Sequence, residues 1–179
     1  MPENIFKNCT LNISIQQIIG FIHLCGMLTE NIYGFVIPKT FGHDPVYMTL
    51  FLSIPVSWLV CKNECLIFYL VKKYENPQYI MGSNPENAND ISDLFHNLNI
   101  YLVFYYINFG LKMTSILIVN HRSTKIQDII FIPTIILYSI YMHDINCKTE
   151  YTNHIGFRVL LLGLLLGSLY RTLFHMNNI

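Results

Sequence analysis

Long apolar runs follow one another along the chain, each close to the length needed to cross a lipid bilayer. About 20 mostly apolar helical residues span the hydrocarbon core of a membrane. Five runs approach this length, and the spans that they predict are 18–37, 46–66, 100–119, 126–145 and 155–174. The pattern therefore predicts an all-α integral membrane helical bundle of five transmembrane helices, with residues 1–179 forming a single membrane domain.

The second run is the weakest of the five. Its strongest apolar part, Val46 to Val60, corresponds to about 22 Å of helix, which is short of the roughly 30 Å hydrocarbon core. The polar cluster CKNEC follows at 61–65. Either the helix stops there and the cluster lies at the membrane interface, or the helix continues with the cluster inside the protein. Four spans are therefore the alternative to five.

The longest polar segment is 72–93, which contains two prolines and many asparagines and is expected to form a long aqueous loop. Basic residues are divided almost evenly between the two sides of the predicted topology, so the positive-inside rule leaves the orientation open. Cys9 and Cys147 fall on the same side in a five-span chain. Whether that side is an oxidising compartment stays open with the orientation.

Composition supports the membrane class and excludes others. Of 179 residues, 53% are hydrophobic and 12% are charged, with a mean hydropathy of +0.40, whereas about a quarter of the residues of a soluble domain are charged. The 11 basic and 11 acidic side chains give no net charge, so no basic field is present to attract nucleic acid. The expected location is a membrane, and the expected partner is the lipid bilayer.

Polar side chains within the spans are expected to face the protein interior, because they are costly in hydrocarbon. Gln16, His23 and Glu30 are seven residues apart and therefore share one face of the first helix. A second stripe follows the third span at steps of four and three residues, through Tyr101, Tyr105, Asn108, Lys112 and Ser115.

Lys112 is the most informative of these residues, because it is the 13th residue of the span 100–119. A lone ammonium at such a depth costs at least about 2.5 kcal/mol, which a carboxylate partner would reduce. Glu30 and Glu64 are the candidates, and Glu30 is the better placed. We expect an ion-paired polar seam between the first and third spans, with candidate members Gln16, His23, Glu30, Glu64, Asn108 and Lys112. The alternative is that Lys112 extends its head to the interface.

Glycines in the fifth span form a small-residue motif. Gly163 and Gly167 are four apart, and Gly156 lies seven residues before Gly163. Glycines on one helix face allow two helices to approach closely. The motif predicts helix packing, either within the bundle or against a second copy or another membrane partner.

Motifs of known chemistry are missing from the sequence. It has no GxSxG, no phosphate-binding glycine loop, no HExxH and none of the paired or clustered histidines of membrane haem and di-iron proteins. We therefore predict no catalytic residue, no metal site and no cofactor.

The stretch from Ser57 to Leu94 carries a pattern of an aromatic residue, a polar cluster with cysteine, and a helix that ends in paired basic residues. It resembles uncharacterised small multi-pass membrane proteins of large DNA viruses and protists, although Ser57 stands where a histidine often precedes the tryptophan. The residues that carry the resemblance are Trp58, Asn63, Glu64, Cys65, Lys72 and Lys73. The resemblance implies a membrane location and a viral or protist source but no reaction.

Three functions follow as hypotheses. The leading one is a non-enzymatic membrane component that assembles with itself or with a partner through the fifth helix. The first alternative is a small transporter or proton/ion conductor that uses Glu30, His23, Lys112 and Glu64. The second alternative is an intramembrane lipid-modifying enzyme that uses His23 and Glu64.

Overall fold

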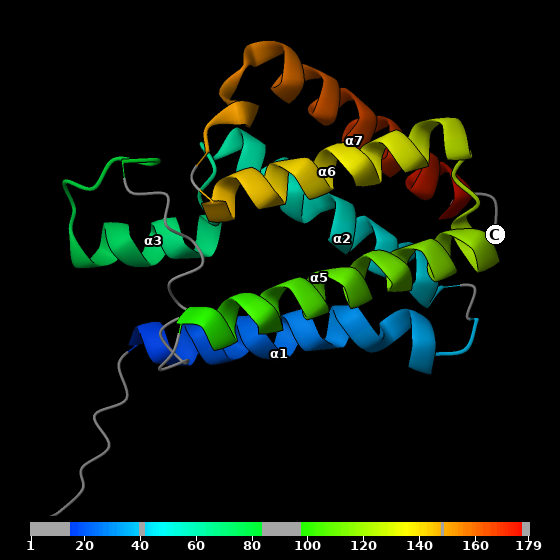
Figure 1. The fold of residues 1–179 in the computed structure, drawn as a ribbon, viewed down its shortest axis with the longest axis horizontal. Coiled ribbons are helices and arrows are strands. Elements are labelled where there is room, and N and C mark those ends of the chain that lie inside the picture. The colour runs from blue at the N-terminus through cyan, green and yellow to red at the C-terminus, as the bar shows by residue number, and fades with distance from the viewer. Residues whose placement is uncertain (1–14, 40–41, 84–97, 148, 177–179) are drawn as a thin grey trace, which may run out of the picture.

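The computed structural model describes residues 15–39, 42–83, 98–147 and 149–176, and in these residues it contains helices but no strand. The predicted all-α class is confirmed. The elements are α1 (Ile15–Val36), α2 (His43–Val60), α3 (Leu66–Glu75), α5 (Leu98–Val119), the π-helical turn η1 (Asn120–Thr124), α6 (Asp128–Cys147), the 3₁₀ turn η2 (Tyr151–Asn153) and α7 (Ile155–Met176) (Figure 1).

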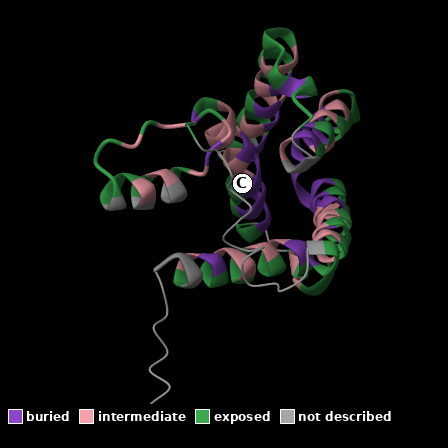
Figure 2. Ribbon diagram, turned by 60° about the vertical axis from the view of Figure 1, so that its left-hand side comes forward, coloured by how far each residue is buried: buried purple, intermediate pink, exposed green. Residues whose placement is uncertain are grey.

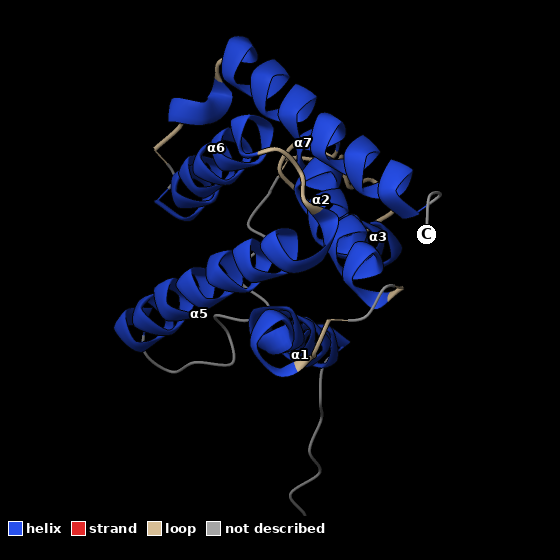
Figure 3. Ribbon diagram, turned by 90° about the vertical axis from the view of Figure 1, so that its right-hand side faces the viewer, coloured by secondary structure: helices blue, strands red, loops and turns tan. Residues whose placement is uncertain are grey.

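The long helices form two layers. One layer consists of α1 and α5 side by side, and the other contains α2, α6 and α7 (Figures 1 and 3). The turn η1 connects the two layers, because it joins α5 to α6 and also contacts α2. The short helix α3 projects from one end of the bundle (Figures 1 and 2).

Contacts between α1 and α5 show that these two helices run in the same direction. The contacting pairs are Asn31 with Asn108, Gly34 with Ser115 and Glu30 with Lys112. Their sequence separations, 77, 81 and 82, are nearly constant, as parallel helices require. The chain therefore has to return to the starting end between α1 and α5, and α2 is the described helix that runs back (Figure 1).

In the described part of the chain, four helices are long and apolar enough to cross a membrane: Ile18–Val36, Asn99–Thr124, Asp128–Ile145 and Ile155–Phe174. Their large exposed apolar side chains suit contact with lipid chains. By length and composition, these helices are those expected of a membrane protein. The helix α2 is not among the four; its first turn contains the buried Asp44, and it packs against helices of both layers.

The predicted span 46–66 is wrong as one continuous helix. The helix α2 ends at Val60, and Lys62 and Asn63 have positive φ angles of 55° and 67°, which do not fit an α-helix. A separate helix, α3, then begins at Leu66 and continues to Glu75. The predicted loop 72–93 therefore begins only at Asn76, and its part from 84 to 93 lies outside the described residues.

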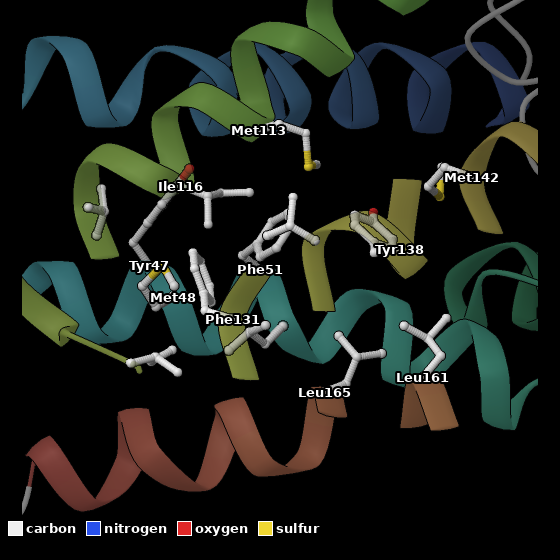
Figure 4. Packing of buried hydrophobic residues seen from close by; sticks show 14 of the residues in the cluster. Tyr47, Met48, Phe51, Met113, Ile116, Phe131, Tyr138, Met142, Leu161 and Leu165 are labelled. Carbon is white, nitrogen blue, oxygen red and sulfur yellow. The ribbon is translucent and has the colours of Figure 1, made fainter. Parts of the chain in front are cut away.

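The hydrophobic core lies where the two layers meet. In Figure 4, Phe51 of α2 lies at its centre, with Met113 and Ile116 of α5 on one side and Leu161 and Leu165 of α7 on the other. The core residues share nearly complete burial, whereas the outer helix faces are exposed (Figure 2). The bundle is thus held by side chains that meet at α2.

The helices α1 and α5 approach each other closely at Gly34, a glycine that was not predicted to pack against another helix. A Cβ atom on Gly34 would lie 2.4 Å from the carbonyl oxygen of Ser115. A Cβ atom on Gly156, Gly163 or Gly167 would meet nothing within 4 Å. Of the two alternatives for these glycines, packing within the bundle is therefore not observed, because a Cβ atom at each position would meet open space. Contact with a second copy or a membrane partner stays a prediction.

Replacing Gly34 with Ala should lower the free energy of unfolding by about 1–3 kcal/mol, since overpacking forces the backbone to shift. Gly163→Ala is the matched control. It adds a methyl group in open space and should be neutral or stabilising by up to about 1 kcal/mol, because Ala favours helix more than Gly. Unfolding in mild detergent, followed by circular dichroism, measures both. Equal stability of the two variants would contradict the close contact.

Candidate functional site: a polar column between α1 and α5

The ion pair predicted for Lys112 is present. Its Nζ lies 2.6 Å from Glu30 Oε2, with exposed side-chain fractions of 12% and 20%, respectively. The ammonium also lies 5.0 Å from the centre of the Phe51 ring, which adds a cation–π contact from α2. Lys112 is therefore held inside the bundle and is not extended to the interface.

A pair of asparagines lies beside the ion pair. Asn31 Nδ2 donates to Asn108 Oδ1 at 2.6 Å, and Asn108 Nδ2 donates to the carbonyl oxygen of Phe104 at 2.7 Å. Asn31 is only 1% exposed, yet its Oδ1 has no hydrogen-bond donor in the described protein. Asn108 was predicted for the seam, whereas Asn31 was not, because it lies outside the seven-residue spacing of Gln16, His23 and Glu30.

A cluster of hydroxyl groups continues the polar contacts toward the C-terminal end of α1. Tyr47 donates to the carbonyl oxygen of Glu30 at 2.8 Å and lies 3.0 Å from Ser115 Oγ. The backbone N–H of Gly34 donates to that same Oγ at 2.8 Å. Tyr47 also stacks on Tyr33, with 4.2 Å between ring centres. These bonds fix α1, α2 and α5 to one another.

At the end of α1, Arg122 binds Asp44 with two hydrogen bonds, of 2.9 and 2.7 Å. Its Nη1 donates to the carbonyl oxygens of Gly34 at 3.1 Å and Ile37 at 2.6 Å. Carbonyl groups at the end of a helix have no hydrogen-bond donor within the helix, and Arg122 supplies one here. Asp44 is fully buried and also accepts from Tyr33 at 3.0 Å. This pair was not predicted from the sequence, because Arg122 lies between the predicted spans 100–119 and 126–145.

Together these groups form what we call the polar column. Its members are Glu30, Asn31, Tyr33, Gly34, Asp44, Tyr47, Asn108, Lys112, Ser115 and Arg122.

Glu64 is not part of the polar column. Its Oε1 accepts from Lys72 at 2.9 Å and Tyr79 at 2.6 Å, and its Oε2 accepts from the Gly82 N–H at 2.9 Å. Burial favours the neutral acid, but these hydrogen bonds outweigh it and hold the pKa of Glu64 below its usual range. Because the chain leaves α2 before residue 64, this carboxylate organises the segment after α2.

Two further polar residues anchor the same end of the bundle. Asn63 accepts from Tyr141 at 2.8 Å and also from Arg158, which ties the end of α2 to α6 and α7. Asp144 accepts from the N–H groups of Tyr151 at 2.9 Å and Thr152 at 2.8 Å and thereby holds η2. Both side chains therefore have structural roles.

The remaining predicted residues have less defined places. His23 is half-buried on α1, seven residues before Glu30. Gln16 lies in the first turn of α1, with its side chain outside the description, and Cys9 and the side chain of Cys147 are also outside it. Within the described part of the chain, no group of three or more His, Cys, Asp or Glu side chains is placed to hold a metal ion.

Comparison with known proteins returned no matching family model, no matching curated protein and no matching solved structure. The polar column therefore has to be interpreted from its own chemistry. It contains the Glu30–Lys112 ion pair between α1 and α5, the Asp44–Arg122 pair near the end of α1, and amide and hydroxyl groups between them.

Proposed function

We propose that this protein is a multi-pass membrane protein with five crossings. Four are the long apolar helices described above, and α2 provides the additional one. The observation that carries the proposal is the parallel packing of α1 on α5. If both helices cross the bilayer in the same direction, the chain between them has to cross back. A helix covered by other helices needs fewer apolar residues than one that faces lipid, which accounts for the more polar start of α2.

Side-specific labelling of single cysteines tests this topology in a background without native cysteines. Lys39 precedes α2, and Gln78 follows α3; both are exposed. Lys39→Cys and Gln78→Cys should react with a membrane-impermeant maleimide from opposite sides of sealed vesicles. Lys125→Cys, in the exposed segment between α5 and α6, is the control and should react from the side of Lys39→Cys. Labelling of positions 39 and 78 from one side would mean that α2 does not cross.

Within this topology, the protein is proposed to be a non-enzymatic membrane component. Its buried carboxylates are engaged in contacts that hold helices or turns together: Asp44 with Arg122, Glu64 with Lys72, and Asp144 with η2. A catalytic acid or base instead needs a position from which it can reach a substrate proton. The lipid-modifying alternative also lacks support, because the described partners of Glu64 are Lys72, Tyr79 and Gly82 and do not include His23.

A further inference from the structure

At the centre of the polar column, Lys112 and Asn31 can form more hydrogen bonds than the described residues make with them. The ammonium of Lys112 has three donors, and its described oxygen partner is Glu30 Oε2. Asn31 Oδ1, on the neighbouring residue of α1, is buried without a donor. Unsatisfied groups inside a membrane bundle are costly, and in native proteins they commonly mark a water or ion. We therefore expect water beside the ion pair.

Polar groups continue from this centre in both directions along the bundle. Ser115 follows Lys112 on α5, and Arg122 follows in the adjoining turn η1. Asn108 and the buried Tyr101 precede Lys112 on α5. Tyr101 and Arg122 are 21 residues apart in sequence, which corresponds to about 32 Å of helix and is close to the thickness of the hydrocarbon core. The polar groups thus extend along α5 and η1 over a length close to the depth of a membrane.

We propose that the polar column is a proton pathway in which the Glu30–Lys112 pair binds and releases the proton. A hydronium ion from one side gives its proton to the Glu30 carboxylate, which leaves water and a neutral acid. The Lys112 ammonium then gives a proton to water toward the other side, forming a new hydronium ion and a neutral amine. Transfer of the Glu30 proton to that amine restores the ion pair. The net result is that one proton has moved from one side to the other, and only bonds to hydrogen have been broken and formed.

Other elements also place titratable groups toward Glu30. Within the described chain, these are Lys112 from α5, Tyr47 from α2 and Tyr138 from α6. Glu30 is the acidic side chain paired with the mid-span ammonium, so it is the expected acceptor of the incoming proton. The proton pathway is a function beyond the proposed topology, and the two are tested by separate experiments.

Proton flux into sealed vesicles tests the pathway. Purified protein is reconstituted into liposomes that contain a pH-sensitive dye, and a potassium gradient with valinomycin drives proton entry. Wild-type vesicles should acidify several-fold faster than empty vesicles, and Glu30→Gln should reduce the rate to the empty level. Thr114→Val is the matched control, because Thr114 is exposed on α5 and bonds to the carbonyl oxygen of Gly110; it should keep the wild-type rate.

Glu30→Gln also breaks an ion pair, so a second measurement uses the folded wild-type protein. An apolar carbodiimide modifies protonated carboxyl groups within hydrocarbon. Peptide mass spectrometry should locate the adduct on Glu30, and flux should fall in proportion to its modification. A wild-type rate equal to that of empty vesicles would overturn the pathway and leave the topology intact. Full flux in folded Glu30→Gln protein, or after complete modification of Glu30, would overturn the role of this carboxylate.

Discussion

Arg122→Met is expected to lower the free energy of unfolding by about 3–5 kcal/mol, which is typical of removing one partner from a buried ion pair. The fully buried Asp44 would lose two charge-assisted hydrogen bonds, and the carbonyl oxygens of Gly34 and Ile37 would lose their donor. The methionine stem preserves most of the packing, so the loss reports on the guanidinium. Denaturant unfolding in mild detergent, followed by circular dichroism, measures the change.

Two further variants separate this loss from a general effect of removing a positive charge. Arg171 is exposed on α7, and Arg171→Met should change stability by less than about 0.5 kcal/mol. The double variant Asp44→Asn/Arg122→Met leaves no charge at positions 44 and 122 and should recover part of the stability lost in Arg122→Met. Arg122→Met protein as stable as Arg171→Met protein would show that the pair does not hold α1 to α2.

Periodicity within each helix, together with the cost of a lone ammonium in lipid, favoured Glu30 over Glu64 as the partner of Lys112. The stripe on each span follows from helical geometry alone, and the cost of an unpaired ammonium in lipid indicated that the two stripes face each other. The same reasoning predicted Asn108 in the column. The contacts that were predicted correctly therefore depend on local helix geometry and on the cost of polar groups in lipid.

Contacts that depend on how the chain turns were not predictable in this way. Glu64 was placed in the seam on the assumption that the second helix continues, but positive φ angles at Lys62 and Asn63 end the helix first. Arg122 and Asp44 are 78 residues apart and meet only because α1 and α5 end at the same side of the bundle. One signal was available: the polar cluster at 61–65 marked a break after α2.

Glycine spacing left the packing partner of the fifth span open for a related reason. The motif at Gly163 and Gly167 shows which residues share a face, but not whether that face meets another helix. The structure turns it outward and uses the unrepeated Gly34 for the close contact with Ser115. A single glycine opposite a serine leaves no periodic pattern, so only the tertiary arrangement reveals it.

Lys112→Met should lower the free energy of unfolding by about 3 kcal/mol, at the lower end of the range for a broken buried pair, because both side chains of the pair keep some exposure. The variant removes an ammonium that is itself costly in a membrane. Its expected loss therefore comes from Glu30, which is left without its described charged partner. The Phe51 ring loses its cation at the same time.

The double variant Glu30→Leu/Lys112→Met makes this reasoning testable. Replacing both members of a buried pair with apolar residues of similar volume is often neutral or stabilising, so the double variant should unfold near the wild-type midpoint, although Lys112→Met alone does not. The mutant cycle should then give a coupling energy of at least about 3 kcal/mol between positions 30 and 112, because the double variant avoids the losses of both single variants. Additive effects of the two single substitutions would mean that the carboxylate and the ammonium do not stabilise each other, and that the polar column is held together by its asparagine, hydroxyl and arginine contacts instead.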